Sequence, residues 1–414
     1  MPCANPDAQH PRMMRYHAAF KPAEECFMLS ESSIKLQPLP RIVFGAGAAD
    51  QIGKHALETG KLRALLVTDP GLSKAGLAGA IADRLKTDGF EVAIFDGVEP
   101  NPTDKNVAAG VAQLKKLGDA VVIALGGGSS MDCAKAIALL ARNEGHPREY
   151  SYGCKPKQSG APVIAIPTTA GTGSETNLVG VITDTEQHRK LYVAHPSVQP
   201  RISVLDPKLT IGLPAYPTAT CGFDVLTHAI EAYTSRATNP YSDGVAMQAV
   251  KMAWTHLPTA FANGADLEAR SQMLLASAMA AIAFNVAGLG AAHGTGHPIS
   301  ARFHTAHGQT LATMLPHVMR FNLDTRAAKY AEIAVAIGAA KAGATDTENA
   351  KACIAAVEGL VQRLGLRKNL KDLGVAGKDI GPLVDDALQD MTMRTNPRKV
   401  SADDAKALFE AALA

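Results

Sequence analysis

An aspartate and several histidines stand at spacings that suit a metal site. Asp224 and His228 are four residues apart, as are His293 and His297, and five of the 13 histidines fall within residues 293–317. On a helix, residues at i and i+4 share one face. Imidazole and carboxylate ligands together suit Zn²⁺ or Fe²⁺, and they leave a coordination position for a substrate oxygen. A single Asp–His pair is also common on ordinary helix surfaces, so the prediction depends on the combination.

A glycine-rich turn offers different chemistry at residues 121–135. The segment VVIALGGGSSMDCAK has the pattern of a strand, a turn and a helix. Glycines let backbone N–H groups approach a pyrophosphate, and a helix N-terminus favours its negative charge. The pattern differs from GxGxxG, and such turns also occur without a ligand. We interpret it as the phosphate site of a dinucleotide.

Two further segments fit the same cofactor. The loop IPTTAGTGSET (166–176) is rich in hydroxyls that can donate to a phosphate or to the nicotinamide amide, although an ordinary loop has the same composition. Asp69 ends the apolar segment 62–69. A carboxylate there can accept hydrogen bonds from both ribose hydroxyls and would repel a 2′-phosphate, which favours NAD over NADP. A helix N-cap is the alternative role for Asp69.

Alternating strands and helices must position these motifs. Strand and helix patterns alternate up to about residue 170, which predicts parallel pairing in a doubly wound sheet. After about residue 213 the chain is Ala-rich with helical spacing. We therefore expect an N-terminal extension (1–30), an α/β dinucleotide-binding domain (31–212) and an all-helical metal and substrate domain (213–414). The segments with these patterns are strands at 41–45, 62–69, 91–98, 119–130 and 162–169, and helices at 75–85, 103–117 and 131–142.

Composition excludes several other classes of protein. Lys+Arg number 41 and Asp+Glu 39, so no basic stripe points to nucleic acid. The six cysteines are scattered without a CxxC pair, which argues against a disulfide scaffold and for a reducing compartment. The N-terminus lacks signal-peptide order, so we expect a cytoplasmic protein. Residues 274–292 carry no charge, but their Ala and Gly content favours a buried helix over a membrane span.

Together these motifs resemble the iron-dependent (group III) alcohol dehydrogenase family. The resemblance covers nearly the whole chain from about residue 38. It implies a dehydroquinate synthase-like architecture, with NAD(P) bound between an α/β domain and a helical domain that holds Fe²⁺ or Zn²⁺. It also implies a small alcohol or aldehyde substrate and a homodimer or larger homo-oligomer. The matching motifs are VTDPGL, PNPTDKNV, GGGSSMDCAK, PTTAGTGSE, DVLTHAIEAY and GLGAAHGTGHPISARFHTAHG.

The resemblance also implies a role for individual residues. The metal ligands fall on Asp224, His228, His293 and His307. His297 matches a histidine that is not a ligand but lies near the substrate and the nicotinamide, which suits a proton relay. The cofactor positions, of which Asn101 and Lys190 match less closely than the rest, are Asp69, Asn101, Gly127, Gly128, Ser129, Asp132, Thr168, Thr169, Thr172 and Lys190.

Four positions depart from the family pattern. Gly296 stands where Ala is usual, Ala306 where Pro is usual, Ser300 where Gly is usual and Cys221 where Thr is common. Since all four ligand positions are kept, the departures bear on the shape of the pocket rather than on metal binding.

The implied reaction is hydride transfer between a small primary alcohol or diol and nicotinamide, with the metal as Lewis acid. Other activities of the same superfamily are a polyol dehydrogenase, a hydroxyacid–oxoacid transhydrogenase and a dehydroquinate-synthase-like lyase. The apolar residues Phe284, Leu289 and Phe303 argue against the lyase, which needs a more polar pocket. A non-catalytic nucleotide- or metal-binding module is the alternative from another class, and the complete ligand set disfavours it.

Overall fold

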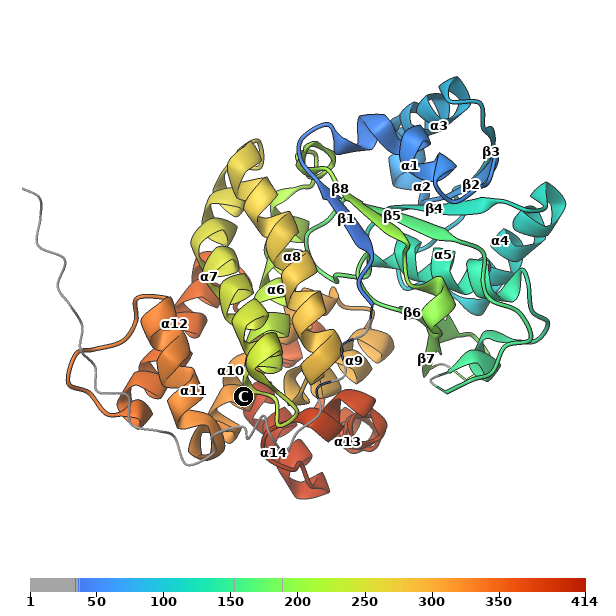
Figure 1. Cartoon of the computed structure of the whole chain (residues 1–414). Coiled ribbons are helices and arrows are strands. Elements are labelled where there is room, and N and C mark those ends of the chain that lie inside the picture. Colours follow the sequence, from blue (N-terminus) through green and yellow to red (C-terminus); the bar gives the residue numbers. More distant parts are fainter. Residues whose placement is uncertain (1–33, 35, 37, 152, 188) are drawn as a thin grey trace, which may run out of the picture. The chain divides into compact units, whose positions relative to one another are not determined.

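A six-stranded parallel sheet forms the first part of the computed structural model (Figure 1), which describes residues 34, 36, 38–151, 153–187 and 189–414. The strand order is β1-β8-β5-β4-β2-β3, and every neighbouring pair is parallel. The predicted extension at residues 1–30 lies outside the described residues. The strands of this sheet are β1 (Arg41–Phe44), β2 (Arg63–Val67), β3 (Glu91–Phe95), β4 (Val121–Gly126), β5 (Val163–Pro167) and β8 (Ile202–Leu205).

Helices cover both faces of this sheet, as the alternating pattern predicts. Successive side chains of a strand point to opposite faces. Leu65 of β2 accordingly belongs to the apolar core beneath α4 (Asp104–Leu117) and α5 (Gly128–Leu140). Its neighbour Leu66 belongs to the core beneath α1 (Ile52–Leu57) and α3 (Leu77–Thr87). The doubly wound α/β architecture is therefore confirmed.

The structure differs from the predicted elements in several places. The helix expected at 75–85 is α3, and a separate short helix, α2 (Pro70–Lys74), precedes it, because Gly76 between them has a φ of 81° that breaks the helix. Strand β8 of the main sheet was not among the predicted strands. The chain also forms an antiparallel hairpin of β6 (Val179–Asp184) and β7 (Arg189–Ala194), which the strand patterns did not predict.

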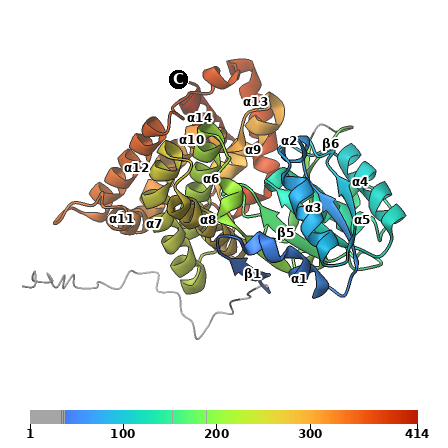
Figure 2. The same cartoon turned by 90° about the horizontal axis from the view of Figure 1, so that it is seen from above.

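Helices alone form the rest of the chain after β8. In Figure 2 they lie side by side with the sheet and its covering helices. No strand is found between Leu205 and Ala414, and residues 35–414 form one compact unit, so the division into two domains stays a prediction. These helices are α6 (Ala215–Thr234), α7 (Pro240–Ala262), α8 (Leu267–Ala287), α9 (Ala291–Phe303), α10 (His307–Phe321), α11 (Leu323–Ala336), α12 (Asp346–Arg363), α13 (Ile380–Gln389) and α14 (Ala402–Leu413).

The uncharged segment 274–292 lies mainly in α8, which packs closely against α6 and α7. Most of the α8 side chains from Met273 to Ala283 are buried, as predicted. Among the residues that the structure describes, no single helix is long and apolar enough to cross a membrane. Only α8 and α9 taken together pass that test, and their axes are bent by 109°.

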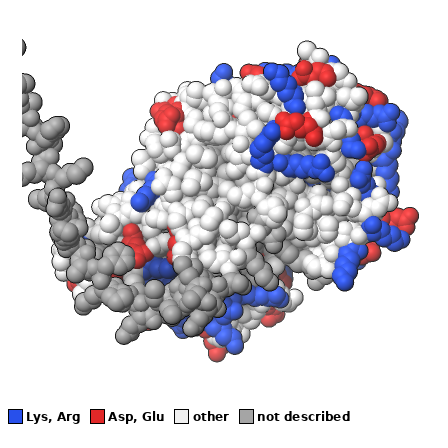
Figure 3. Space-filling model, in the orientation of Figure 1, with Lys and Arg blue, Asp and Glu red and all other residues white. Residues whose placement is uncertain are grey.

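Charged side chains are unevenly spread over the face drawn in Figure 3. Basic and acidic residues lie next to one another over the α/β part, whereas the area over α6, α7 and α8 carries few of either. This face therefore presents no extended surface of one charge sign.

Candidate active site

The three cofactor motifs meet at one edge of the parallel sheet. Asp69 follows the end of β2, Gly127 follows β4 and Thr168 follows β5. These strands are neighbours in the order β5-β4-β2, so their carboxyl ends lie side by side. Ligands of open α/β sheets bind outside these ends, where helix N-termini also point.

Two glycines allow the turn after β4 to approach the loop after β5. Gly126 has a φ of 142°, which L side chains rarely adopt. A Cβ on Gly128 would lie 2.6 Å from Thr172 Cγ2. The turn after β4 and the loop after β5 therefore form one surface, which includes the N-terminus of α5.

Hydrogen bonds of two residues of α5, Lys135 and Asp132, stabilise this surface. Lys135 is fully buried and donates to Ser174 Oγ at 2.7 Å, to Asn177 Oδ1 at 2.7 Å and to the carbonyl oxygen of Val179 at 2.8 Å. Asp132 accepts from Ser174 Oγ at 2.6 Å and from the backbone N–H of Val181 at 3.1 Å. Asp132 therefore connects the loop after β5 with strand β6. Lys135 was not among the residues that the sequence analysis selected.

Asp69 has the N-cap role that was considered as the alternative for it. Its Oδ1 accepts from the backbone N–H groups of Gly71 (2.9 Å) and Leu72 (3.1 Å), so it is the N-cap of α2. The residue also lines the cavity described below. One carboxylate oxygen thus caps the helix, and the cap does not use the second.

Asn101 and Lys190 are brought together on the same side of the cavity. Lys190 Nζ donates to Asn101 Oδ1 at 2.8 Å and to Thr183 Oγ1 at 3.0 Å. Burial lowers the pKa of Lys190 to about 8. Asn101 has a φ of 57°, a left-handed conformation that asparagine tolerates better than most residues.

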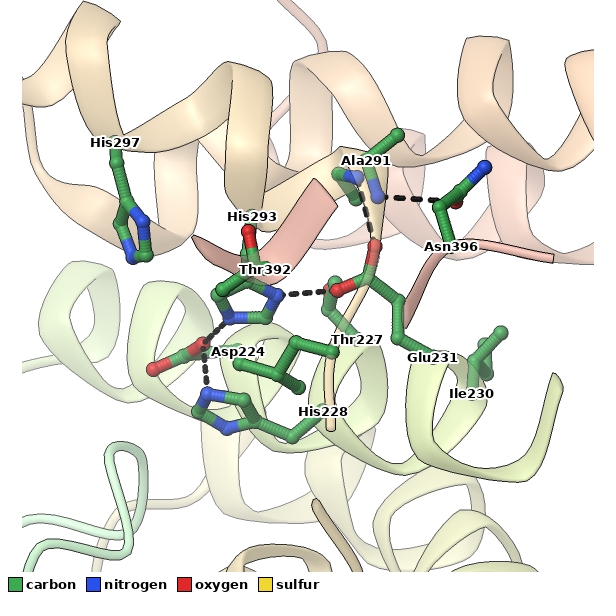
Figure 4. Close-up of polar contacts among 12 residues, drawn as sticks. Asp224, Thr227, His228, Ile230, Glu231, Ala291, His293, His297, Thr392 and Asn396 are labelled. Atoms are coloured by element: carbon green, nitrogen blue, oxygen red, sulfur yellow. Dashed lines mark hydrogen bonds and ion pairs between the residues drawn. The ribbon is translucent and has the colours of Figure 1, made fainter. Parts of the chain in front are cut away.

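The predicted metal ligands converge from three helices, as Figure 4 shows for Asp224, His228 and His293. Asp224 Oδ1 lies 3.4 Å from the Nε2 atoms of both His228 and His293. The ligand atoms of these three residues all lie within 4.8 Å of one another. His307, the first residue of α10, places its Nε2 3.8 Å from Asp224 Oδ1. Gly308 makes this approach possible, because a Cβ there would lie 1.9 Å from the carbonyl oxygen of Thr220 in α6.

The burial of this cluster fits a bound cation. Among the described residues, Asp224 Oδ1 and His293 Nε2 are buried without a hydrogen-bond partner. Such atoms are costly unless an ion or water satisfies them. Burial lowers the pKa of His228 to about 4, so its ring is neutral and able to bind a metal. Burial alone would raise the pKa of Asp224, but the neighbouring imidazoles, His228 first, outweigh it and hold this pKa well below its ordinary value.

Glu231 is a further member of the site that the sequence analysis missed. Its Oε2 lies 2.5 Å from His293 Nδ1, and its Oε1 accepts from the backbone N–H of Ala292 at 2.7 Å (Figure 4). Burial would lower the pKa of His293, but Glu231 and Asp224 raise it to about 9. The signal was present in the sequence, since Glu231 stands seven residues after Asp224 and shares its helix face.

His297 lies beside the ligands and makes a different contact. Its ring stacks on His307, with centroids 5.2 Å apart. Its Nδ1 lies 2.8 Å from Asp390 Oδ2, which also accepts from Tyr192 Oη at 3.1 Å. Neither Asp390 nor Tyr192 belongs to a motif of the sequence analysis.

One cavity of about 1490 Å³ connects the ends of β2, β4 and β5 with the Asp–His cluster. This volume exceeds that of a typical small-ligand pocket, as a dinucleotide with a substrate requires. The cavity extends from Asp69 and the glycine turn to the histidine cluster. Every predicted site residue lines it, namely Asp69, Asn101, Gly127, Gly128, Ser129, Asp132, Thr168, Thr169, Thr172, Lys190, Asp224, His228, His293, His297 and His307.

Comparison with known proteins assigns the family. Residues 40–207 match the family described as iron-containing alcohol dehydrogenase, and residues 218–413 match the C-terminal part of the Fe-containing alcohol dehydrogenase family. An NAD-dependent methanol dehydrogenase of Bacillus methanolicus is 37% identical over 374 residues, which are 90% of this chain and 98% of that protein. The chain belongs to the iron-containing alcohol dehydrogenase family.

Other members of the iron-containing alcohol dehydrogenase family agree with this assignment. A 1,3-propanediol dehydrogenase of Klebsiella pneumoniae is 39% identical over 371 residues, 89% of this chain and 96% of that protein. The crystal structure of a 1,3-propanediol oxidoreductase superposes with a TM-score of 0.89 at 38% identity, covering 92% of this chain and all of that one. The predicted family and fold are therefore confirmed.

Two of the four residues that depart from the family pattern line the cavity, and two do not. Cys221 and Ser300 line the cavity, whereas Gly296 and Ala306 do not. Burial raises the pKa of Cys221 to about 12, so the thiol stays protonated next to the metal ligands. Ser300 Oγ lies 2.8 Å from Thr310 Oγ1, which in turn donates to the carbonyl oxygen of His307. Two of the departures thus face the space that a substrate would occupy.

Proposed function

We propose that the protein is a metal-dependent, NAD-linked alcohol dehydrogenase that interconverts small primary alcohols or diols and their aldehydes. The observation that carries the proposal is the single cavity that joins the nucleotide surface at the ends of β2, β4 and β5 to the Asp–His cluster. Hydride transfer requires cofactor and alcohol in one such space. Methanol and 1,3-propanediol dehydrogenases among the relatives support a small substrate.

Asp224, His228, His293 and His307 would hold the metal, either iron or zinc. Their three nitrogens and one oxygen are the donor set that both ions accept. When bound, the metal supplies Lewis-acid polarisation of the substrate oxygen, and NAD supplies the hydride acceptor. The unpartnered Asp224 Oδ1 and His293 Nε2 support this assignment.

The protein's own residues orient the reactants and move the proton. Thr168, Thr169 and Thr172 offer hydroxyls to the nucleotide, while the N-terminus of α5 faces its phosphates. Phe284 packs against the His228 ring, with centroids 4.7 Å apart, and helps to keep water from the reacting atoms. His297, with a side chain 23% exposed at the cavity wall, accepts the alcohol proton and passes it to solvent.

Asp69 supports NAD over NADP as the cofactor. Its Oδ1 is used by the helix cap, so Oδ2 is the atom available to a ribose hydroxyl. The negative charge would repel the 2′-phosphate of NADP.

We further propose, from the family alone, that the chain forms a homodimer or larger homo-oligomer. Light scattering after gel filtration tests this proposal.

The test is a scan of C2–C6 alcohols, diols and hydroxy acids with NAD⁺, followed as NADH absorbance, on protein loaded anaerobically with Fe²⁺ or Zn²⁺. We expect turnover of short primary alcohols or diols that a chelator abolishes. Turnover without added cofactor would favour a transhydrogenase, which keeps its NAD bound. Absence of metal-dependent turnover on every alcohol and aldehyde would overturn the proposal.

A further inference from the structure

Asp390 contacts His297 but is not itself among the residues that line the cavity. His297 lines the cavity with a 23% exposed side chain, whereas the Asp390 side chain is only 8% exposed. The two residues are 93 positions apart in the sequence, and His297 Nδ1 lies 2.8 Å from Asp390 Oδ2. Asp390 is therefore placed to act on the reaction through the side chains that it contacts, and His297 is the one that lies beside the proposed metal ligands.

Asp390 is itself held on both carboxylate oxygens. Oδ1 accepts from the backbone N–H of Thr392 at 2.9 Å and from its hydroxyl at 2.7 Å. Oδ2 accepts from His297 and from Tyr192 Oη, which lies 3.1 Å away on β7. Donors from the hairpin and from the helical part of the chain thus fix the orientation of one carboxylate.

Asp390 is ionised at neutral pH. Burial alone would raise its pKa, but His297 and the hydrogen bonds from His297 and Thr392 outweigh burial and hold this pKa well below its ordinary value. An ionised carboxylate only accepts hydrogen bonds. The proton between the two side chains therefore belongs to His297 Nδ1.

We infer that Asp390 is the positioning residue of the proton relay. It fixes the orientation of the His297 ring through the contact between Nδ1 and Asp390 Oδ2, which leaves Nε2 for the proton of the alcohol, and Tyr192 orients the carboxylate from β7. The inference rests on the proposed function. As the alcohol O–H bond breaks, its proton would pass to His297 Nε2, and His297 would release it to solvent. NAD, when bound, would accept the carbinol hydride, so that the alcohol becomes an aldehyde and NAD⁺ becomes NADH.

Replacing Asp390 by Asn tests the tautomer with almost no change in size. An amide that still accepts from Thr392 turns its NH₂ group toward His297 Nδ1, which favours the tautomer protonated on Nε2. We expect kcat for alcohol oxidation to fall at least about 100-fold, the scale of one lost acid–base group. KM, metal content and the Kd of NADH should stay within about twofold of wild type.

Two further variants calibrate this result. Tyr192→Phe removes one donor to Asp390 and leaves the carboxylate, so its kcat should fall by less than tenfold. Asp385→Asn makes the same chemical change at an exposed position of α13 and should leave kcat unchanged. An equal loss in Asp390→Asn and Asp385→Asn would overturn the inference.

The deciding readout is the tautomer of His297, which does not depend on turnover. Zinc-loaded protein labelled with ¹⁵N-histidine is compared by long-range ¹H–¹⁵N NMR, with His297→Gln identifying the resonance. We expect an Nδ1–H tautomer in wild type and an Nε2–H tautomer in Asp390→Asn. An Nε2–H tautomer in wild type, or an unchanged tautomer and kcat in Asp390→Asn, would overturn the inference. A wild type that oxidises no alcohol overturns the proposed function instead, and the NMR comparison still decides how Asp390 holds His297.

Discussion

Replacement of Glu231 by Gln should weaken metal binding while every proposed ligand stays in place. Glu231 Oε2 lies 2.5 Å from His293 Nδ1, and Oε1 accepts from the backbone N–H of Ala292. With a metal bound, the carboxylate accepts the hydrogen bond from His293 Nδ1–H and leaves Nε2 for the metal. A glutamine that still accepts from Ala292 points its NH₂ group at Nδ1. It thereby favours a proton on Nε2, the atom that must bind the metal.

The size of the effect follows from the burial of His293. Loss of such a partner typically weakens metal affinity by about 10–100-fold, or about 1.4–2.7 kcal/mol. Because His293 is 1% exposed, water cannot easily replace the lost acceptor, and we expect the upper end of this range.

The assay is competition for Zn²⁺ against a chromophoric chelator at pH 7.5. Glu268→Gln serves as the matched control, because this exposed side chain lies on α8, outside the Asp–His cluster, and accepts a hydrogen bond from Gln272. We expect the control to keep the wild-type Kd. A Kd for Glu231→Gln within twofold of wild type would refute the reasoning.

Three further predictions follow from particular contacts. Asp69→Asn keeps a good N-cap but removes the charge, so the ratio of kcat/KM for NADP⁺ over NAD⁺ should rise at least about tenfold by steady-state kinetics; an unchanged ratio would contradict the role of Asp69. In metal-free protein, His293 has a pKa raised to about 9. The contribution of its charge to the free energy of unfolding, measured with urea, should therefore be complete below about pH 6.5 and be lost as pH rises through about 9. The apparent Zn²⁺ affinity should rise over the same pH range, and no change in either quantity with pH would contradict the raised pKa of His293. Gly308→Ala should lower the free energy of unfolding by about 1–3 kcal/mol and weaken Zn²⁺ binding, because the new Cβ would meet the Thr220 carbonyl at 1.9 Å; a stability equal to wild type would show that α6 and α10 do not approach so closely.

Local patterns were sufficient to predict that Asp69, Gly127 and Thr168 lie close together. Asp69, Gly127 and Thr168 each follow an apolar strand, and parallel pairing brings strand ends to one edge. The i and i+4 spacing of Asp224 and His228 likewise predicted a shared helix face. These features depend on a few neighbouring residues, so the sequence alone carries them.

Contacts between distant segments were not predictable in this way. Asp390 meets His297 only after α13 folds back onto α9, and Tyr192 reaches it through a hairpin that the strand patterns did not indicate. Asp132 lines the cavity as expected of a cofactor position, and its hydrogen bonds with Ser174 and the backbone N–H of Val181 were not predictable from the sequence. Such side-chain directions depend on packing between elements, which single-sequence periodicity does not contain.

The most direct test of the central claim is metal content measured together with NADH formation, on anaerobically purified wild type and His293→Ala. The account predicts about one iron or zinc ion per wild-type chain, and loss of both metal and activity in His293→Ala. His297→Ala should keep the metal and slow turnover. Full activity in a metal-free His293→Ala protein would contradict the account.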